Sequence, residues 1–243
     1  MPLAAVHEHR HATESGAILF DAARLPQGDP TLLDTARWPA IGASGRAAVH
    51  RVEGTFGHGI LRHYRRGGLI ARFSRDLYLW IGEDATRAFR EFRLLAELRR
   101  RDLPVPAPLA AGYRRRGAFY CADLLTEELS QTRTLAAALP DLAAQPALWQ
   151  QLGSTLARFH AAGVWHADLN AHNLLLDASQ RWWLIDFDRG RLLQPASSWA
   201  HSRLARLHRS LLKVGAAALP GWSDGWHGLR QAHDAALQRH ISP

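Results

Sequence analysis

Short hydrophobic runs alternate with polar turns in the first half of the chain, and this pattern predicts β-strands. From Trp38 the sequence reads "WPAIGASGRAAVHRVEG", with two runs around a turn at residues 42–45, and "GILRHYRRGG" adds a third run that ends at Gly67-Gly68. Two more runs, "PLAAGY" and "AFYCADLL", flank an arginine-rich turn at residues 114–117. Together these runs predict a five-stranded antiparallel sheet.

Helical spacing of apolar residues appears once within the strand-rich part and dominates the chain after Asp123. The stretch "DATRAFREFRLLAELRRR" predicts one long helix capped by Asp84 or Thr86, and "LPVPAP" ends it. The later stretch "LWQQLGSTLARFHAAG" has leucines on one helical face and stops at Gly163, a residue suited to a left-handed helix end. The segment "WAHSRLARLHRSLLKVG" predicts a further helix.

Between these helices, "NLLLD" and "WWLIDFD" predict a hairpin that carries Asp186 at the end of an apolar strand. Residues 1–30 are rich in histidine, contain proline and glycine, and show little periodicity, which predicts an irregular N-terminal arm. The patterns therefore predict an α+β, two-lobed fold, with a β-rich first lobe over residues 31–123 and a mainly helical second lobe over residues 124–243.

Composition narrows the class of protein. The chain has 243 residues, 47% of them hydrophobic, and Cys121 is its single cysteine, which fits a reducing compartment and excludes an intrachain disulfide. No apolar run approaches the roughly 20 residues of a membrane helix, and the N-terminus lacks the apolar core of a signal peptide, so we expect a cytoplasmic location. The net charge is +8 and Lys213 is the only lysine. Arginine binds phosphate groups well, although an arginine-rich solvated surface explains the charge equally well.

The chemistry-bearing motif is "HADLNAHN", which places His166, Asp168 and Asn173 in one short stretch. Thirteen residues after Asn173 comes "DFD", residues 186–188. This is the order of a kinase-like catalytic loop, hairpin and metal-binding carboxylate. Phosphoryl transfer requires a carboxylate at the acceptor hydroxyl and oxygen ligands for the Mg²⁺ that bridges the phosphates of ATP. The order predicts Asp168 as the proton acceptor, and Asn173 and Asp186 as metal ligands.

The first lobe supplies possible nucleotide contacts. Gly42 and Gly45 frame a turn whose backbone N–H groups can approach phosphates, although an ordinary hairpin turn fits the same residues. Glu91 lies on the apolar face of the predicted long helix, where a carboxylate requires a cationic partner. A kinase-like fold pairs such a glutamate with a lysine on the third strand, and here Arg62 occupies that position. We therefore predict an Arg62–Glu91 pair, with an outward-facing Arg62 as the alternative.

Several stretches resemble the lipopolysaccharide core kinase family, which has the protein-kinase-like fold. They are "LRHYRRGGL", "TRAFREFRLLAEL", "LPVPAP", "ADLLTEEL", "HADLNAHNLLLD" and "LIDFDRGR", and together they span most of the chain from the third strand onward. The resemblance implies ATP- and Mg²⁺-dependent phosphorylation of the 4-hydroxyl of a 3-deoxy-D-manno-octulosonic acid (Kdo) residue on a lipid A precursor. It also implies a peripheral position at the cytoplasmic face of the Gram-negative inner membrane.

The resemblance also suggests roles for further residues. His166 supports the catalytic loop by hydrogen bonding, and Asp188, which replaces the glycine of an Asp-Phe-Gly motif, adds an oxygen near the metal. Arginines around residues 67–68, among them Arg65, Arg66 and Arg72, can bind the acidic sugar and lipid phosphates and draw the protein to an anionic membrane surface.

Alternatives remain open in the substrate class. Ala167 and Asn170 stand where protein kinases have an arginine and a lysine, which favours a small or lipid-linked acceptor over a peptide. A kinase of the same fold that acts on a core heptose or an aminoglycoside would carry the same motifs. The non-enzymatic alternatives are a pseudokinase and a basic nucleic-acid-binding protein. Against the second, the positive charges are scattered along the chain and no nucleic-acid motif is present. We therefore expect no nucleic-acid partner, and infer no obligate protein partner.

Overall fold

The computed structural model describes residues 3–41, 49–65, 76–142 and 145–241. The chain divides into two compact units by its internal contacts. Unit 1 comprises Met1–Asp102 and Pro106–Glu128, and unit 2 comprises Leu103–Val105 and Leu129–Pro243.

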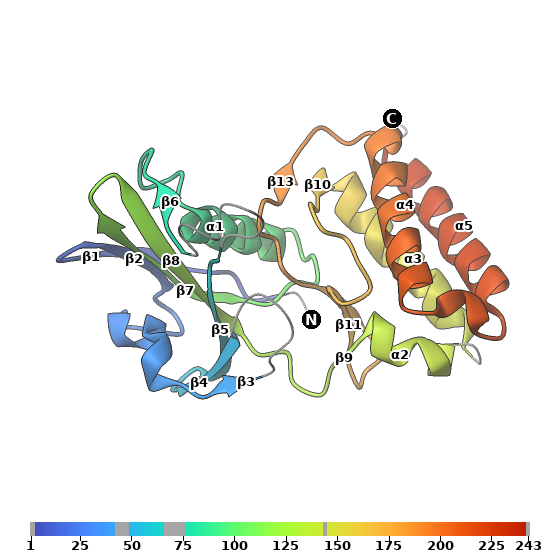
Figure 1. The fold of residues 1–243 in the computed structure, drawn as a ribbon. Coiled ribbons are helices and arrows are strands. Elements are labelled where there is room, and N and C mark those ends of the chain that lie inside the picture. The colour runs from blue at the N-terminus through green and yellow to red at the C-terminus, as the bar shows by residue number, and fades with distance from the viewer. Residues whose placement is uncertain (1–2, 42–48, 66–75, 143–144, 242–243) are drawn as a thin grey trace. The chain divides into compact units, whose positions relative to one another are not determined.

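Unit 1 is built on an antiparallel sheet in the order β1-β2-β7-β8-β5-β4-β3, with β6 paired to β8 (Figure 1). Its eight strands, counted within the described residues, are β1 (Glu8–Thr13), β2 (Gly16–Asp21), β3 (Ala40–Ile41), β4 (Val49–Gly54), β5 (Gly57–His63), β6 (Tyr78–Leu79), β7 (Pro108–Arg116) and β8 (Phe119–Glu127). The five-strand prediction is therefore wrong. The three additional strands are β1, β2 and the two-residue β6.

The prediction of an irregular arm over residues 1–30 is also wrong, because residues 8–21 form the β1–β2 hairpin. Residues 17–20 of β2 are an unbroken apolar run, and all four are buried where β2 pairs with β7. A strand between two neighbours has a continuous hydrophobic sequence when both of its faces are covered, so alternation is absent there. Residues 22–29 form turns, and two short 3₁₀ helices follow, η1 (Pro30–Leu33) and η2 (Thr35–Arg37).

Helix α1 (Arg87–Arg100) packs against β7 and β8. It begins directly after Thr86, as predicted, although the Thr86 side chain makes no capping hydrogen bond. Phe89, Phe92 and Leu95 are fully buried on its inner face, and Glu91 lies among them with only 4% of its surface exposed. The long helix and its buried carboxylate thus occur where the sequence predicted them.

Unit 2 is mainly helical, and Figure 1 shows α3, α4 and α5 side by side. Gly153 allows α3 to approach α5 closely, because a Cβ atom there would lie 2.1 Å from the Leu229 carbonyl oxygen. No helix in the described part of the chain has the length and apolar character needed to cross a membrane. The helices of unit 2 are α2 (Leu135–Leu142), α3 (Pro146–Ala161), α4 (Ser197–Lys213), the 3₁₀ helix η4 (Ala216–Ala218) and α5 (Trp222–Ile241).

Small strands in unit 2 hold the motif-bearing loops. The predicted hairpin is present, with β11 antiparallel to β12, and β9 pairs with the other edge of β11. The strand β10 pairs with β13. Gly163 has a left-handed φ of 77° two residues after the end of α3, as the helix-end prediction requires. These strands are β9 (Arg133–Thr134), β10 (Val164–Trp165), β11 (Leu174–Leu176), β12 (Trp182–Leu184) and β13 (Arg191–Leu192).

The boundary between the two units lies beyond the predicted one. Asp123 lies in the middle of β8, which continues to Glu127, so the first unit extends to Glu128. The boundary was predicted at Asp123 because the helical pattern begins after it, but Asp123 is 2% exposed within the strand and its carboxylate is paired with His63 and Arg114. Paired in this way, the carboxylate is tolerated inside the sheet.

Candidate active site

The "HADLNAHN" motif forms the loop between β10 and β11, and side-chain amides fix its shape. Asn170 Oδ1 accepts hydrogen bonds from the backbone N–H groups of His172 and Asn173 at 2.8 and 3.1 Å. The side-chain nitrogens of Asn170 and Asn173 both donate to the Asp168 carbonyl oxygen, at 3.1 and 2.9 Å. The loop is thus held by its own polar groups, with the Asp168 side chain half exposed.

His166 ties this loop to the strand that precedes Asp186. Its Nε2 lies 3.0 Å from the Ile185 carbonyl oxygen, and its Nδ1 accepts a hydrogen bond from the Asp168 backbone N–H at 3.2 Å. Because a carbonyl only accepts, Nε2 carries the proton and the ring is neutral. Burial of this 2%-exposed ring lowers the pKa of His166, outweighing the neighbouring groups that raise it. This geometry fits the predicted supporting role.

Asp186 follows β12 in a left-handed backbone conformation, with a φ of 62° that is uncommon for an aspartate. The next residue, Phe187, anchors the turn because it is 1% exposed and packs against Phe159 and His166. The Ile185 backbone N–H also donates to the Asn173 carbonyl oxygen at 3.0 Å. Loop and turn are therefore linked through both backbone and side chains.

Burial, hydrogen bonds and the charge of Asp186 all act on the Asp168 carboxylate. Burial raises the pKa of Asp168, but the hydrogen bonds from Arg206 and Asn170 lower it by a larger amount. The pKa of Asp168 therefore lies below its usual value. The negative charge of Asp186 acts in the raising direction on Asp168. Asp168 is consequently an ionised carboxylate at neutral pH, able to accept a hydrogen bond or a proton.

The donor atoms fit a hard cation such as Mg²⁺. Mg²⁺ prefers oxygen ligands, and aspartate and asparagine provide them. Since the Asn173 side-chain nitrogen donates to Asp168, its Oδ1 is the side-chain atom suited to a cation. Asp186 contributes a carboxylate from the linked turn, and Asp188 is half-buried two residues later. These residues are those that the sequence predicted for a metal.

In unit 1, Arg62 on β5 contacts Glu91 on α1. One guanidinium nitrogen of Arg62 lies 2.6 Å from each Glu91 carboxylate oxygen. The Tyr64 hydroxyl donates to Glu91 Oε2 at 2.6 Å, and the Tyr64 ring lies 5.0 Å from the Arg62 guanidinium carbon. The predicted pair is therefore present, and the alternative of an outward-facing Arg62 is not what the structure shows. Burial, followed by the Glu91 charge, raises the pKa of Tyr64.

Other predicted residues are placed less fully. Gly42, Gly45, Arg66 and Arg72 lie outside the described residues. Arg65 follows β5 and is exposed. Their predicted roles therefore stay predictions.

Arg206 of α4, which no sequence motif indicates, is the closest cation to the Asp168 carboxylate among the contacts of the described residues. Arg206 Nε lies 3.1 Å from Asp168 Oδ1, and a second guanidinium nitrogen contacts the same oxygen. The contact joins residues 38 positions apart and belongs to no motif. Tyr64 was not predicted either, although its spacing of two from Arg62 places both residues on one face of an extended strand.

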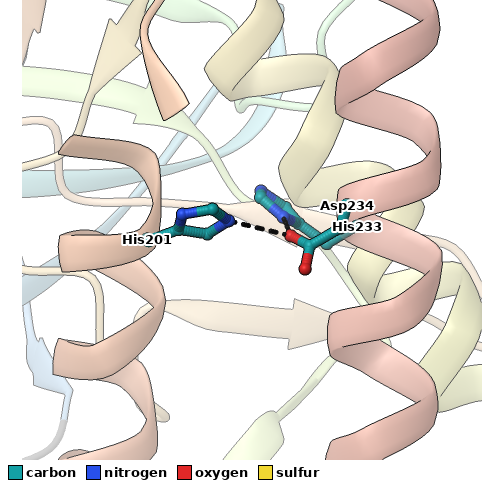
Figure 2. Close-up of side chains that lie close together, drawn as sticks. All are labelled: His201, His233 and Asp234. Carbon is teal, nitrogen blue, oxygen red and sulfur yellow. Dashed lines mark hydrogen bonds and ion pairs between the residues drawn. The ribbon is translucent and has the colours of Figure 1, made fainter. Parts of the chain in front are cut away.

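A second group of titratable side chains lies between helices of unit 2, away from the motif in sequence. Asp234 Oδ1 lies 3.0 Å from His201 Nε2 and 2.9 Å from His233 Nδ1 (Figure 2). His233 Nε2 lies 2.8 Å from His160 Nδ1, and both rings are buried. Burial, assisted by the positive potential of neighbouring residues, lowers the pKa of His160 to about 3.

A catalytic loop, a hairpin and a carboxylate turn in this order are typical of a kinase. The model of the lipopolysaccharide kinase (Kdo/WaaP) family matches residues 39–232. The chain therefore belongs to the lipopolysaccharide kinase (Kdo/WaaP) family, which confirms the resemblance and disfavours the non-enzymatic alternatives.

Curated relatives agree with this assignment. A protein of Xanthomonas campestris pv. campestris (strain B100) is 51% identical over 214 residues, which cover 86% of each chain. A protein of Stenotrophomonas maltophilia (strain R551-3) is 46% identical over 230 residues, covering 92% of each chain. Both relatives are named 3-deoxy-D-manno-octulosonic acid kinase.

Proposed function

We propose that this protein is an ATP-dependent kinase that phosphorylates the 4-hydroxyl of Kdo in a Kdo–lipid A precursor during lipopolysaccharide core biosynthesis. The observation that carries the proposal is the similarity to two proteins named 3-deoxy-D-manno-octulosonic acid kinase over 86% and 92% of both chains. The site supports it, because its carboxylates and amide are the groups that phosphoryl transfer to a hydroxyl requires.

In the proposed reaction Asp168 binds the acceptor hydroxyl. The hydroxyl oxygen bonds to the γ-phosphorus of ATP, the bond to the bridging oxygen breaks with its electrons leaving on ADP, and the proton passes to Asp168. Asn173 and Asp186, with Asp188 nearby, would hold Mg²⁺, which supplies charge neutralisation at the phosphates when it is bound. His166 keeps the loop in shape, because it bonds to both the Asp168 backbone N–H and the Ile185 carbonyl.

Arg62 takes the role that a third-strand lysine has in other kinases. Glu91 orients its guanidinium through two contacts of 2.6 Å, and we assign Arg62 to the nucleotide phosphates. Gly42 and Gly45 belong to the same proposal, as the turn whose backbone N–H groups approach those phosphates.

We also assign the protein to the cytoplasmic face of the inner membrane, bound peripherally. An apolar tip on unit 1, formed by Leu79, Ile81 and Phe119, supports this, since these side chains are 57%, 74% and 43% exposed. Leu79 and Phe119 are paired across β6 and β8. The exposed residues Arg115 and Arg116 end the adjacent strand β7, and their charge suits an anionic lipid surface.

The test is transfer of labelled γ-phosphate from Mg²⁺-ATP to a Kdo-bearing lipid A precursor, beside a Kdo-free precursor and a heptose-bearing core acceptor. We expect label on the Kdo-bearing lipid alone, at the 4-position by NMR of the product, and label that is reduced by about 100-fold or more with the Asp168→Asn variant. Label only on the heptose-bearing acceptor would reject Kdo and keep the kinase assignment.

A further inference from the structure

Three arginines lie on α4, the helix that contacts the catalytic loop of unit 2. They are Arg203, Arg206 and Arg209, spaced three residues apart, so they follow one side of the helix. Ser210 of the same helix accepts a hydrogen bond from the Ala171 backbone N–H at 3.1 Å, which fixes α4 against the loop. We call these three arginines the α4 cluster.

The α4 cluster carries more positive charge than its described surroundings neutralise. Within the described residues, Arg206 contacts Asp168, whereas neither Arg203 nor Arg209 has an ion pair with a carboxylate. Arg203 donates to Ser202 Oγ at 3.0 Å, but its buried Nε has no hydrogen-bond partner among the described residues. Burial, together with the charges of Arg206 and Arg209, lowers the pKa of Arg203. An anion between these guanidinium groups would relieve that repulsion.

Trp165 orders part of this cluster without neutralising it. The Arg203 guanidinium carbon lies 4.9 Å from the centroid of the Trp165 ring, and Arg191 lies 5.9 Å from the same ring. A cation over an aromatic face is attracted to it and keeps its full charge. Trp165 directly precedes His166, so the ordered arginine lies next to the start of the catalytic loop.

Asp168 and Arg206 are both open to solvent, with side chains 50% and 43% exposed. An incoming acceptor can therefore reach both. In the structure Arg206 is bound to the carboxylate that would receive the acceptor proton, which makes that carboxylate a weaker base. An acceptor that brings its own carboxylate offers Arg206 a second partner of the same chemical type, and planar guanidinium groups bind carboxylates through paired hydrogen bonds.

We infer that the α4 cluster is a subsite for the carboxylate of the acceptor sugar acid, and that Arg206 moves from Asp168 to this carboxylate when the acceptor binds. The inference rests on the proposed function, because it takes an acidic sugar as the acceptor. Two observations favour the sugar carboxylate over the lipid phosphates as the ligand of the α4 cluster. Arg206 of the cluster contacts Asp168, the proposed proton acceptor, and the carboxylate belongs to the sugar that carries the reacting hydroxyl. Arg203 and Arg209 complete the subsite.

Kinetics with a modified acceptor test this inference. The acceptors are the Kdo–lipid A precursor, the same lipid with its Kdo carboxylate reduced to an alcohol, and the same lipid without lipid A phosphates. For a charge-assisted contact we expect kcat/KM of wild type to fall about 10- to 100-fold on the reduced acceptor. Arg203→Gln should lose a similar factor on the natural acceptor and little more on the reduced one, with KM for ATP unchanged. Lys213→Gln removes a positive charge from the same helix and serves as the matched control.

A binding measurement separates failure of the subsite from failure of the proposed function. Free Kdo and its carboxyl-reduced analogue are titrated into the protein by calorimetry, which needs no turnover. Binding of Kdo that is weakened by reduction and by Arg203→Gln supports the subsite even if no phosphate is transferred. Equal binding of both sugars, no binding of either, or equal kinetics of Arg203→Gln and Lys213→Gln overturns it. A loss of activity confined to the dephosphorylated lipid would assign the anion site to lipid phosphates and also overturn it.

Discussion

Asp168 and Asp186 are neighbouring carboxylates with different proposed tasks, and substitutions should separate them. Asp168→Asn should lower kcat by about 10²- to 10⁴-fold with KM for ATP nearly unchanged, because it removes the proton acceptor and keeps the loop geometry. Asp186→Ala should also weaken Mg²⁺-ATP binding, because it removes a metal ligand. Steady-state kinetics at several Mg²⁺ concentrations measure both effects. Wild-type activity in Asp168→Asn would disprove the assignment.

Arg62 and Glu91 form an ion pair whose contribution to the free energy of unfolding depends on the burial of Glu91. The Glu91 side chain is 3% exposed, so Arg62→Ala removes a cation that contacts a buried carboxylate. We expect the free energy of unfolding, measured in urea, to fall by about 3 kcal/mol. The control is Arg51→Ala, because Arg51 and its partner Glu128 are 41% and 21% exposed and such a pair contributes less than about 1 kcal/mol. Similar losses in both variants would show that burial of Glu91 does not decide the cost.

At the scale of elements, α1 and the β11–β12 hairpin were predictable because each has a local signature. The helix has apolar residues at helical spacing, and the hairpin has two short apolar runs around a polar turn. Strand β1 carries no such signature, because five of its six residues are exposed and only β2 pairs with it among the described strands. The run at residues 17–20 was a usable signal, but a short apolar run alone does not distinguish a strand from a helix.

The sequence also allowed part of the candidate site to be predicted. Asp168, Asn173 and Asp186 follow from spacing within one motif block, and Arg62 follows from its strand position. Arg206 does not, because its contact with Asp168 depends on how α4 packs against the loop through Ser210. Long-range contacts of this kind are fixed by tertiary packing, for which a single sequence has no periodic signal.

The apolar tip is an element-scale feature whose proposed role is testable. Ile81→Asp places a charge where insertion into the bilayer interface requires an apolar side chain, so it should lower the partition coefficient onto vesicles containing 30% anionic lipid by about 10-fold or more. Co-sedimentation measures the partition. Leu212→Asp, at an exposed leucine on α4, is the matched control and should bind as wild type. Equal binding of wild type and Ile81→Asp would exclude the tip as the membrane contact.

At the scale of the whole molecule, the described arginines differ in whether a carboxylate neutralises their charge. Several arginines are neutralised at the surface of their own unit, such as Arg93 beside Asp84 and Arg133 beside Asp141. Others lack such partners among the described residues, as Arg203 and Arg209 of the α4 cluster do. The net charge of +8 is therefore a poor guide by itself, and the location of the unneutralised arginines is what indicates a binding function.

Global stability should depend on pH through the buried His233, drawn in Figure 2, and its buried neighbour His160. The charged or titratable groups that act on His160 are His233 from α5, His201 and Arg203 from α4, and His166 from the catalytic loop. All of them disfavour its protonated form, as does burial. Burial likewise lowers the pKa of His233, despite the opposing Asp234 carboxylate. The folded protein thus keeps His160 neutral at pH values where the unfolded chain binds a proton.

The sign of the effect follows from the two pKa values of His160, about 3 in the folded protein against an ordinary 6.5. Above pH 6.5 both states are neutral and the stability is fully present; as the pH falls from 6.5 toward 3, only the unfolded state gains a proton. The free energy of unfolding should therefore decrease by up to about 1.4 kcal/mol per pH unit from this residue. Urea unfolding between pH 6.5 and 4.5 should show a smaller slope for His160→Gln than for wild type, whereas His11→Gln, at an exposed position in β1, should keep the wild-type slope. An unchanged slope in His160→Gln would show that another group governs acid unfolding.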